Sequence, residues 1–214
     1  MNDSRMSSLI AAILDGDCAE AVSQAEHLVR GGARPQHIVI QGVEAAMTAL
    51  DAKCTVQHFN LLEIMLAGRA VMEVMKFLYP TGMVTAESKA TVLVASLEGD
   101  VHDLGKNILK IVLIGGGYHV VDCGKDCPLP KLVEAAETSR PLAVGISGLI
   151  TSIIPSVRQV KDALLLRKLE RVKVIAGGAA LKQASPGELN VDFVAESAFD
   201  GLHYLDRIAG GTHE

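Results

Sequence analysis

The stretch Thr91-Val92-Leu93-Val94-Ala95 decides the fold, because five β-branched or apolar residues follow one another without a charge. An uninterrupted run of this kind is typical of a strand that is buried on both faces of a sheet. After a loop, apolar residues recur at helical spacing from about 104 to 114, where Gly115-Gly116-Gly117 ends the pattern. The sequence therefore predicts a buried strand, a loop and a helix.

The same alternation continues to the end of the chain. The further strands that we expect are short apolar runs at 118–121, 142–146, 172–176 and 193–195. The further helices span about 129–138, 154–168 and 199–208. Apolar strands that alternate with amphipathic helices predict a five-stranded parallel sheet in a doubly wound, Rossmann-like α/β fold. Ligands of such sheets bind at the carboxyl ends of the strands, so we expect a site in the loops that follow them.

Residues 1–85 show a different pattern, in which every signal is helical. Apolar residues at helical spacing predict four helices, at about 4–13, 17–30, 35–50 and 56–79. Asp17 suits the N-cap of the second helix, and Pro35 suits the first turn of the third. Short turns between the helices predict a four-helix bundle over 1–85, followed by a separate sheet domain over 88–214.

Composition excludes several functions. The chain has 20 Lys and Arg against 25 Asp and Glu, with three Tyr, four Phe and no Trp. It therefore lacks the basic surface and the stacking rings that nucleic-acid-binding proteins need. The longest nearly uncharged run, 142–154, is too short to span a bilayer, and the first residues lack an apolar signal core. We expect a cytoplasmic protein without a membrane partner.

The loop after the first strand reads E-G-D-V-H-D-L-G-K-N over residues 98–107. It does not fit a phosphate-binding P-loop, because five residues rather than four separate Gly99 from Gly105 and Asn107 stands where Ser or Thr is needed. One His does not hold a bare zinc ion, which needs three or four ligands. Two interpretations stay open: a surface His102 paired with Asp100, or the single protein ligand of a metal that arrives inside a macrocycle.

Asp100-x-His102-x-x-Gly105 resembles the D-x-H-x-x-G signature of cobalamin-binding domains of the methionine synthase type. Ser147-x-Leu149 follows Gly105 after 41 residues, and Gly177-Gly178 follows Leu149 after 27. The three parts of the family's signature are therefore present in order, each at the end of a predicted strand. The helical bundle also resembles the cap domain of this group. The chain as a whole is similar to the stand-alone corrinoid proteins of anaerobic methyltransferase systems, which serve methylamines, methanol or methoxylated aromatics.

The resemblance implies roles for individual residues. His102 is the lower axial ligand of cobalt and the only metal ligand, bound base-off and His-on, and Asp100 is its hydrogen-bonding partner. Gly177 and Gly178 let the nucleotide tail of the cofactor pass against the backbone. The full set of residues implied to contact the cofactor is Asp100, Val101, His102, Asp103, Leu104, Gly105, Ser147, Leu149, Thr151, Gly177, Gly178 and Ser197.

Three features depart from the family's pattern. Ile153 stands where methionine synthase has a Ser that extends the His–Asp relay, so we expect the relay to stop at Asp100 or to reach water. The cap stretch that reads F-L-P-E/D-L in related carriers corresponds here to residues 60–64, and Ser197 stands in an E-S-A stretch where relatives have D-A. The candidates to shield the upper corrin face are Phe59, Leu62 and Met65.

The resemblance implies a methyl carrier rather than a complete enzyme, since the chain shows no zinc cluster or acid/base pair that could activate a methyl donor. The cofactor would alternate between methylcobalamin and cob(I)alamin. The implied partners are a substrate-specific methyltransferase, an acceptor methyltransferase that acts on tetrahydrofolate or coenzyme M, and a reductive activase. Two alternatives stay open: the cobalamin-binding subunit of an adenosylcobalamin mutase, and a cobalamin-dependent sensor or regulator.

Overall fold

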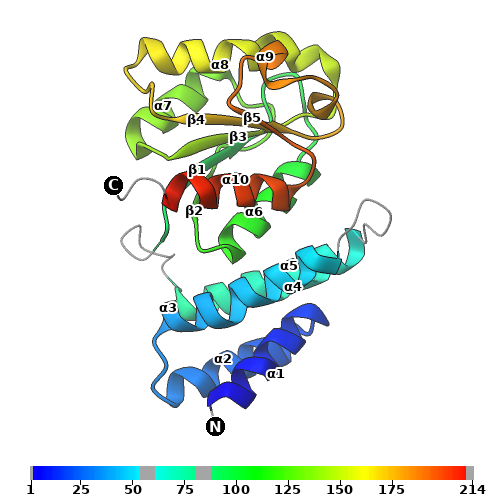
Figure 1. The fold of residues 1–214 in the computed structure, drawn as a ribbon, viewed down its shortest axis with the longest axis vertical. Coiled ribbons are helices and arrows are strands. Elements are labelled where there is room, and N and C mark those ends of the chain that lie inside the picture. The colour runs from blue at the N-terminus through cyan, green and yellow to red at the C-terminus, as the bar shows by residue number, and fades with distance from the viewer. Residues whose placement is uncertain (1, 54–60, 81–87, 211–214) are drawn as a thin grey trace. The chain divides into compact units, whose positions relative to one another are not determined.

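The structure is a computed structural model that describes residues 2–53, 61–80 and 88–210 (Figure 1). The chain folds into two compact units. The helical unit contains residues 1–88 together with 111–117, and the sheet unit contains residues 89–110 together with 118–214. None of the described helices is both long and apolar enough to cross a membrane.

In the described part of residues 1–88, the helical unit contains four helical segments, to which residues 111–117 are added. They are α1 (Asn2–Leu14), α2 (Cys18–Arg30), the continuous run of α3 (Pro35–Ile38), η1 (Val39–Val43) and α4 (Glu44–Lys53), and α5 (Leu61–Leu78). Asp17 caps α2 as predicted, because its carboxylate accepts a hydrogen bond from Glu20 N at 3.0 Å. The π-helical turn η1 was not predicted, since it departs from the period of 3.6 residues on which the prediction rests. The expected start of the fourth helix, at 56, lies outside the described residues.

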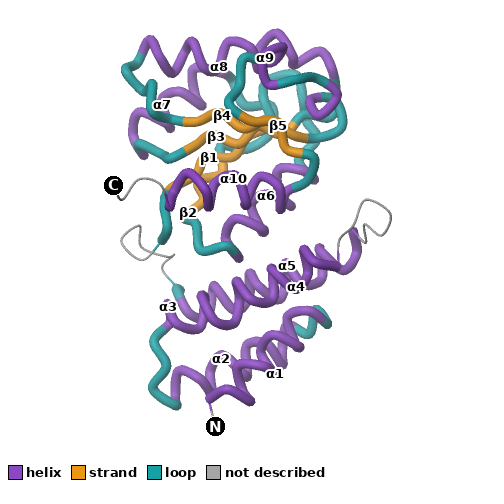
Figure 2. The backbone as a smooth tube through the Cα atoms, in the orientation of Figure 1, coloured by secondary structure: helices purple, strands orange, loops and turns teal. Residues whose placement is uncertain are grey.

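The sheet unit confirms the predicted doubly wound fold. Its five parallel strands are β1 (Thr91–Ala95), β2 (His119–Asp122), β3 (Ala143–Ser147), β4 (Lys173–Gly177) and β5 (Phe193–Ala195). They lie in the order β2-β1-β3-β4-β5 (Figure 2). The helices are α6 (Leu104–Gly115), α7 (Leu129–Ser139), α8 (Ile154–Leu166), α9 (Pro186–Leu189) and α10 (Ala198–Gly210).

Helices cover both faces of the sheet, with α7 and α8 on one face and α10 and the first half of α6 on the other (Figure 1). Strand residues such as Leu93, Val144 and Val174 are fully buried against Leu132 of α7 and Val160 of α8. This packing explains why the strands read as continuous apolar runs. Three short helical pieces were not predicted: η3 (Thr151–Ile153), η4 (Leu181–Gln183) and α9.

The strand order places a ligand crevice at one point of the sheet. The chain runs from β1 to β2 on one side of β1 and then crosses to β3 on the other side. In doubly wound folds, ligands bind outside the carboxyl ends of the strands where the order reverses in this way. The loops after β1 and β3 meet at this point.

Candidate functional site

The loop that follows β1 holds His102 in a defined orientation. Its ring nitrogen Nδ1 lies 2.7 Å from Asp100 Oδ1, and its backbone N–H donates to the same oxygen at 3.0 Å. The other oxygen of Asp100 accepts the backbone N–H of Leu149 at 2.7 Å. The Asp100 side chain is 0% exposed, whereas that of His102 is 51% exposed. A buried carboxylate therefore fixes a ring whose other edge faces outward.

The hydrogen bonds of Asp100 keep it ionised. Burial by itself raises the pKa of this carboxyl group, but the N–H groups of Leu149 and His102 and the His102 ring outweigh that effect, so the pKa lies below its ordinary value. A carboxylate next to Nδ1 holds the ring proton there. The lone pair of the neutral ring then belongs to Nε2, the nitrogen that can bind a metal.

The backbone of the loop is fixed as well. Ser96 is fully buried, and its hydroxyl donates to the carbonyl oxygen of His102 at 2.8 Å. This contact was not predicted from the sequence. The hydrogen bond that the backbone N–H of Leu149 donates to Asp100 was not predicted either. A hydroxyl residue at the end of a buried strand, as at Ser96, is the signal that could have indicated the first contact.

The fold brings the three predicted motifs together. Ser147 pairs with Gly177 in the register of β3 and β4. A Cβ at Gly105 would lie 2.6 Å from Ser147 Oγ, so the start of α6 approaches the end of β3 as closely as a glycine allows. Gly178 has a φ of +96°, and a Cβ there would lie 2.6 Å from the carbonyl oxygen of Gly148.

Exposed apolar side chains lie on the segments that carry His102 and the second motif. Val101, Leu104 and Leu149 are among the exposed large hydrophobic residues of the chain. An apolar surface with one orienting polar group is typical of a site for a largely apolar ligand.

The remaining predicted residues lie at the same edge with different contacts. Asp103 forms a 3.7 Å ion pair with Lys125, and Thr151 is exposed at the start of η3. Ser197 follows β5, and its hydroxyl accepts the backbone N–H of Asp200 at 3.1 Å, which caps α10. Ile153 is buried in the core, and the hydrogen bonds of the Asp100 carboxylate run to His102 and to the Leu149 N–H.

An ion pair with a buried lysine, which was not predicted from the sequence, lies beside the start of α6. Lys106 is 4% exposed, and its ammonium group donates to both oxygens of Asp122 at 2.7 and 2.8 Å. Burial raises the pKa of Asp122, but hydrogen bonds from Lys106, Gly124 N–H and Lys110 bring it below its ordinary value. The pair ties α6 to the end of β2.

The donors of the site fit a metal that is held in a macrocycle. Among the described residues, no group of three or more His, Cys, Asp or Glu side chains could hold a bare ion. Cys123 and Cys127 are buried, and burial, assisted by Cys127 and Asp122, raises the pKa of the Cys123 thiol to about 11. A single imidazole with a fixed proton, an apolar surface and a glycine-lined edge match a corrinoid with one protein ligand.

Comparison with known proteins gives the same assignment. The family model described as B12 binding domain matches residues 90–202, which is more than half of the chain. Dimethylamine corrinoid protein 1 of Methanosarcina acetivorans is 34% identical over 188 residues, covering 86% of this chain and 87% of that protein.

Two solved structures are similar over nearly the whole chain. One is a chain of the methanol:cobalamin methyltransferase complex from Methanosarcina barkeri, with a TM-score of 0.84 and 25% identity, covering 98% of this chain and 81% of that one. The other is a cobalamin-binding protein from Desulfitobacterium hafniense, with a TM-score of 0.75 and 25% identity, covering 94% and 97%.

Proposed function

The chain belongs to the family of proteins with a B12-binding domain, and on that premise we propose that it is a methyl carrier in a corrinoid-dependent methyltransferase system. Its cofactor is cobalamin or a related corrinoid. When bound, the corrinoid supplies a cobalt centre that takes up and releases the methyl group. The protein's own residues bind this cofactor, orient it and shield it.

The observation that carries the proposal is the Asp100–His102 pair. Asp100 Oδ1 lies 2.7 Å from Nδ1 of His102, so Nε2 would be the ring nitrogen that binds cobalt, in the base-off, His-on mode that we propose. Asp100 accepts the Leu149 N–H, which belongs to the second motif, so one hydrogen-bond network would hold both the His102 ring and the edge that we propose for the displaced nucleotide tail.

The tail would pass along the edge formed by the ends of β3 and β4. Ser147 and Thr151 offer hydroxyl groups there, while Gly177 and Gly178 present backbone without side chains. Ser197 offers a further contact after β5. Val101, Leu104 and Leu149 offer apolar surface to the corrin ring.

Of the partners that we propose, the named relatives support a substrate-specific methyltransferase. One relative serves dimethylamine, and another is part of a methanol:cobalamin methyltransferase complex. We propose that a substrate-specific methyltransferase loads this chain, that an acceptor methyltransferase acting on tetrahydrofolate or coenzyme M unloads it, and that a reductive activase restores it. The helical unit over residues 1–85 is proposed to act as a cap, and the sheet domain over 88–214 to hold the cofactor.

The proposal is tested by titrating the purified protein with hydroxocobalamin and recording its visible spectrum. The wild type should bind about one corrinoid per chain. His102→Ala should bind more weakly or give a changed spectrum. His119→Ala makes the same substitution at the first residue of β2, away from the loop after β1, and should behave like the wild type. An unchanged spectrum and affinity in His102→Ala would contradict the ligand assignment.

A further inference from the structure

The segment between β2 and α7, residues 123–127, lies against the loop that carries His102. Ser96 N donates to the carbonyl oxygen of Gly124 at 3.1 Å, and Cys127 N donates to that of Ser96 at 2.9 Å. Glu98 N donates in turn to the carbonyl oxygen of Cys127 at 2.9 Å. The two loops therefore pair like a short continuation of the parallel sheet, up to the turn that precedes His102.

Asp126 contacts this turn through two groups. Its backbone N–H donates to the carbonyl oxygen of Asp100 at 3.0 Å, and its carboxylate Oδ1 accepts the backbone N–H of Gly99 at 2.8 Å. Both bonds act on the backbone from which the Asp100 side chain projects toward His102. The orientation of the Asp100 carboxylate, and through it that of the imidazole ring, thus depends on where Asp126 holds the turn.

The backbone of Asp126 supports a role for its side chain. Its φ is +50°, in the left-handed region that disfavours residues with a Cβ and suits glycine best. An Asp at such a position keeps some strain that a glycine would remove. The carboxylate that bonds to Gly99 is the group that a glycine would lack.

We propose that Asp126 is a positioning residue for the cobalt ligand: it fixes the Gly99–Asp100 turn, and thereby the direction in which His102 presents Nε2. This inference rests on the proposed function, because it requires His102 to be the ligand of the corrinoid. Asp126 acts through the loop and touches neither the metal nor the methyl group.

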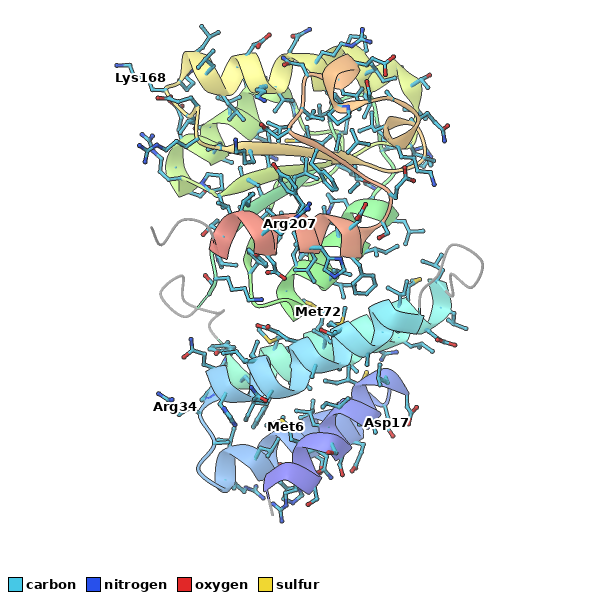
Figure 3. All side chains as sticks on the ribbon, in the orientation of Figure 1. Met6, Asp17, Arg34, Met72, Lys168 and Arg207 are labelled. Carbon is cyan, nitrogen blue, oxygen red and sulfur yellow. The ribbon has the colours of Figure 1, made fainter. Side chains whose placement is uncertain are left out.

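Two substitutions separate positioning from stability. Asp126→Gly removes the acceptor for Gly99 N–H and at the same time relieves the left-handed backbone, so the thermal midpoint should not fall. Asp126→Asn keeps an amide oxygen as acceptor and tolerates the left-handed region, so it should restore wild-type behaviour. Lys168→Gly is the matched control, because Lys168 has a φ of +57° and its side chain points outward beyond the end of α8 (Figure 3).

The measurement is electron paramagnetic resonance of the full-length protein, labelled with nitrogen-15, loaded with cobalamin and reduced to the cobalt(II) state. An axial nitrogen from the protein then splits the signal into a doublet, whereas the unlabelled base of the cofactor gives a triplet. Wild type, Asp126→Asn and Lys168→Gly should show the doublet. Asp126→Gly should lose part of it and bind cobalamin roughly three- to tenfold more weakly, the effect of one lost hydrogen bond.

Each other outcome overturns the inference. A full doublet and wild-type affinity in Asp126→Gly would show that the side chain does not position His102. A fall of the thermal midpoint in both Asp126 variants, together with the doublet, would make the residue structural only. A triplet or no splitting in the wild type would refute His102 ligation itself, and the positioning role with it.

Discussion

At the scale of single residues, Asp100 joins two loops through one buried carboxylate. One oxygen accepts hydrogen bonds from the ring and from the backbone N–H of His102, and the other accepts one from the backbone N–H of Leu149. All three partners are donors, and an ionised carboxylate has only acceptors, so the charge and the hydrogen bonds agree. The same residue thus orients the His102 ring and joins the first motif to the second.

Asp100→Asn should break this arrangement while keeping its shape. An amide has one acceptor oxygen, so its NH₂ group must face a donor, and one buried N–H loses its partner at a cost of about 1–3 kcal/mol. Loss of the carboxylate that orients a metal-bound His lowers metal-site affinity about 10- to 100-fold in other proteins, and we expect a similar loss for corrinoid. Absorbance titration with hydroxocobalamin and urea unfolding measure the two effects.

Asp103→Asn is the comparison for this prediction, because Asp103 is also a predicted cofactor contact but its carboxylate pairs with Lys125 and not with His102. It makes the same chemical change on the other side of His102, where the carboxylate has a 3.7 Å ion pair with Lys125 and is 46% exposed. Exposed pairs of this kind contribute little. Equal affinities of the two Asn variants would contradict a special role for Asp100.

Contacts between residues that are close along the chain could be predicted from the sequence. Asp100 and His102 are two positions apart, so their pairing follows from local geometry. The sequence analysis missed Ser96, Lys106 and Asp126. Their partners are either backbone groups or residues on segments that are distant in sequence, and neither leaves a periodic pattern in the sequence. Leu149 was predicted as a pocket residue, but its hydrogen bond to Asp100 comes from an N–H that every residue except proline possesses.

At the scale of elements, the strands could be predicted to within about one residue because they are buried on both faces. A run such as 142–146 has few other ways to bury its side chains, and the structure has β3 at Ala143–Ser147. The short pieces η3, η4 and α9 could not be predicted from periodicity, because each is shorter than the window in which a period is visible. They take their shape from turns such as the Ser185–Glu188 capping box.

The start of β5 provides a pH-dependent test of how elements are joined. Asp192 accepts Lys161 Nζ at 2.9 Å and Val174 N at 2.9 Å, which ties β5 to α8 and β4. Burial raises the pKa of Asp192, but Lys161, the Val174 N–H and Lys173 lower it below its ordinary value. The contribution of Asp192 to stability is therefore complete above the unfolded-state pKa of about 3.9 and is lost as the pH falls through the lower folded-state pKa.

Asp192→Asn should accordingly lower the free energy of unfolding by about 1–3 kcal/mol at neutral pH. The difference from wild type should stay constant down to about pH 5 and shrink below about pH 4. Urea unfolding at a series of pH values measures it, with Glu134→Gln, an exposed carboxylate on α7, as the control that should stay within about 0.5 kcal/mol. A difference that is independent of pH would mean that the charge of Asp192 does not contribute.

At the scale of the whole molecule, the site and the core that supports it belong to the sheet unit. The three motifs follow β1, β3 and β4, and the buried cluster behind them extends from Leu93 to Val191. The sheet unit begins at Lys89, whose ammonium group lies 3.3 Å from Asp206 of α10, and Tyr118 donates to the same carboxylate at 2.8 Å. These contacts join the first residue of the sheet unit and Tyr118 to its last helix.

We therefore expect residues 88–214 to fold and to bind hydroxocobalamin in the absence of residues 1–87. The isolated piece should be less stable than the full chain, because residues 111–117, which include the end of α6, group with the helical unit and contain the fully buried Val112 and Leu113. Circular dichroism and absorbance titration test both points. A piece that stays unfolded would show that the sheet unit cannot fold without the helical unit, whereas a piece that folds without binding would place part of the cofactor site in the helical unit.

The proposed cap should be visible in the photochemistry of the bound cofactor. Methylcobalamin held by residues 88–214 should photolyse faster than methylcobalamin held by the full chain, since the helical unit is proposed to shield its upper face. Leu62 and Met65 are exposed on α5, whereas Phe59, the third candidate, lies outside the described residues. In the full chain, Leu62→Ala with Met65→Ala should speed photolysis, and Phe77→Ala, an exposed apolar residue near the other end of α5, should not. Equal rates in the isolated piece and the full chain would mean that the helices do not shield the methyl group.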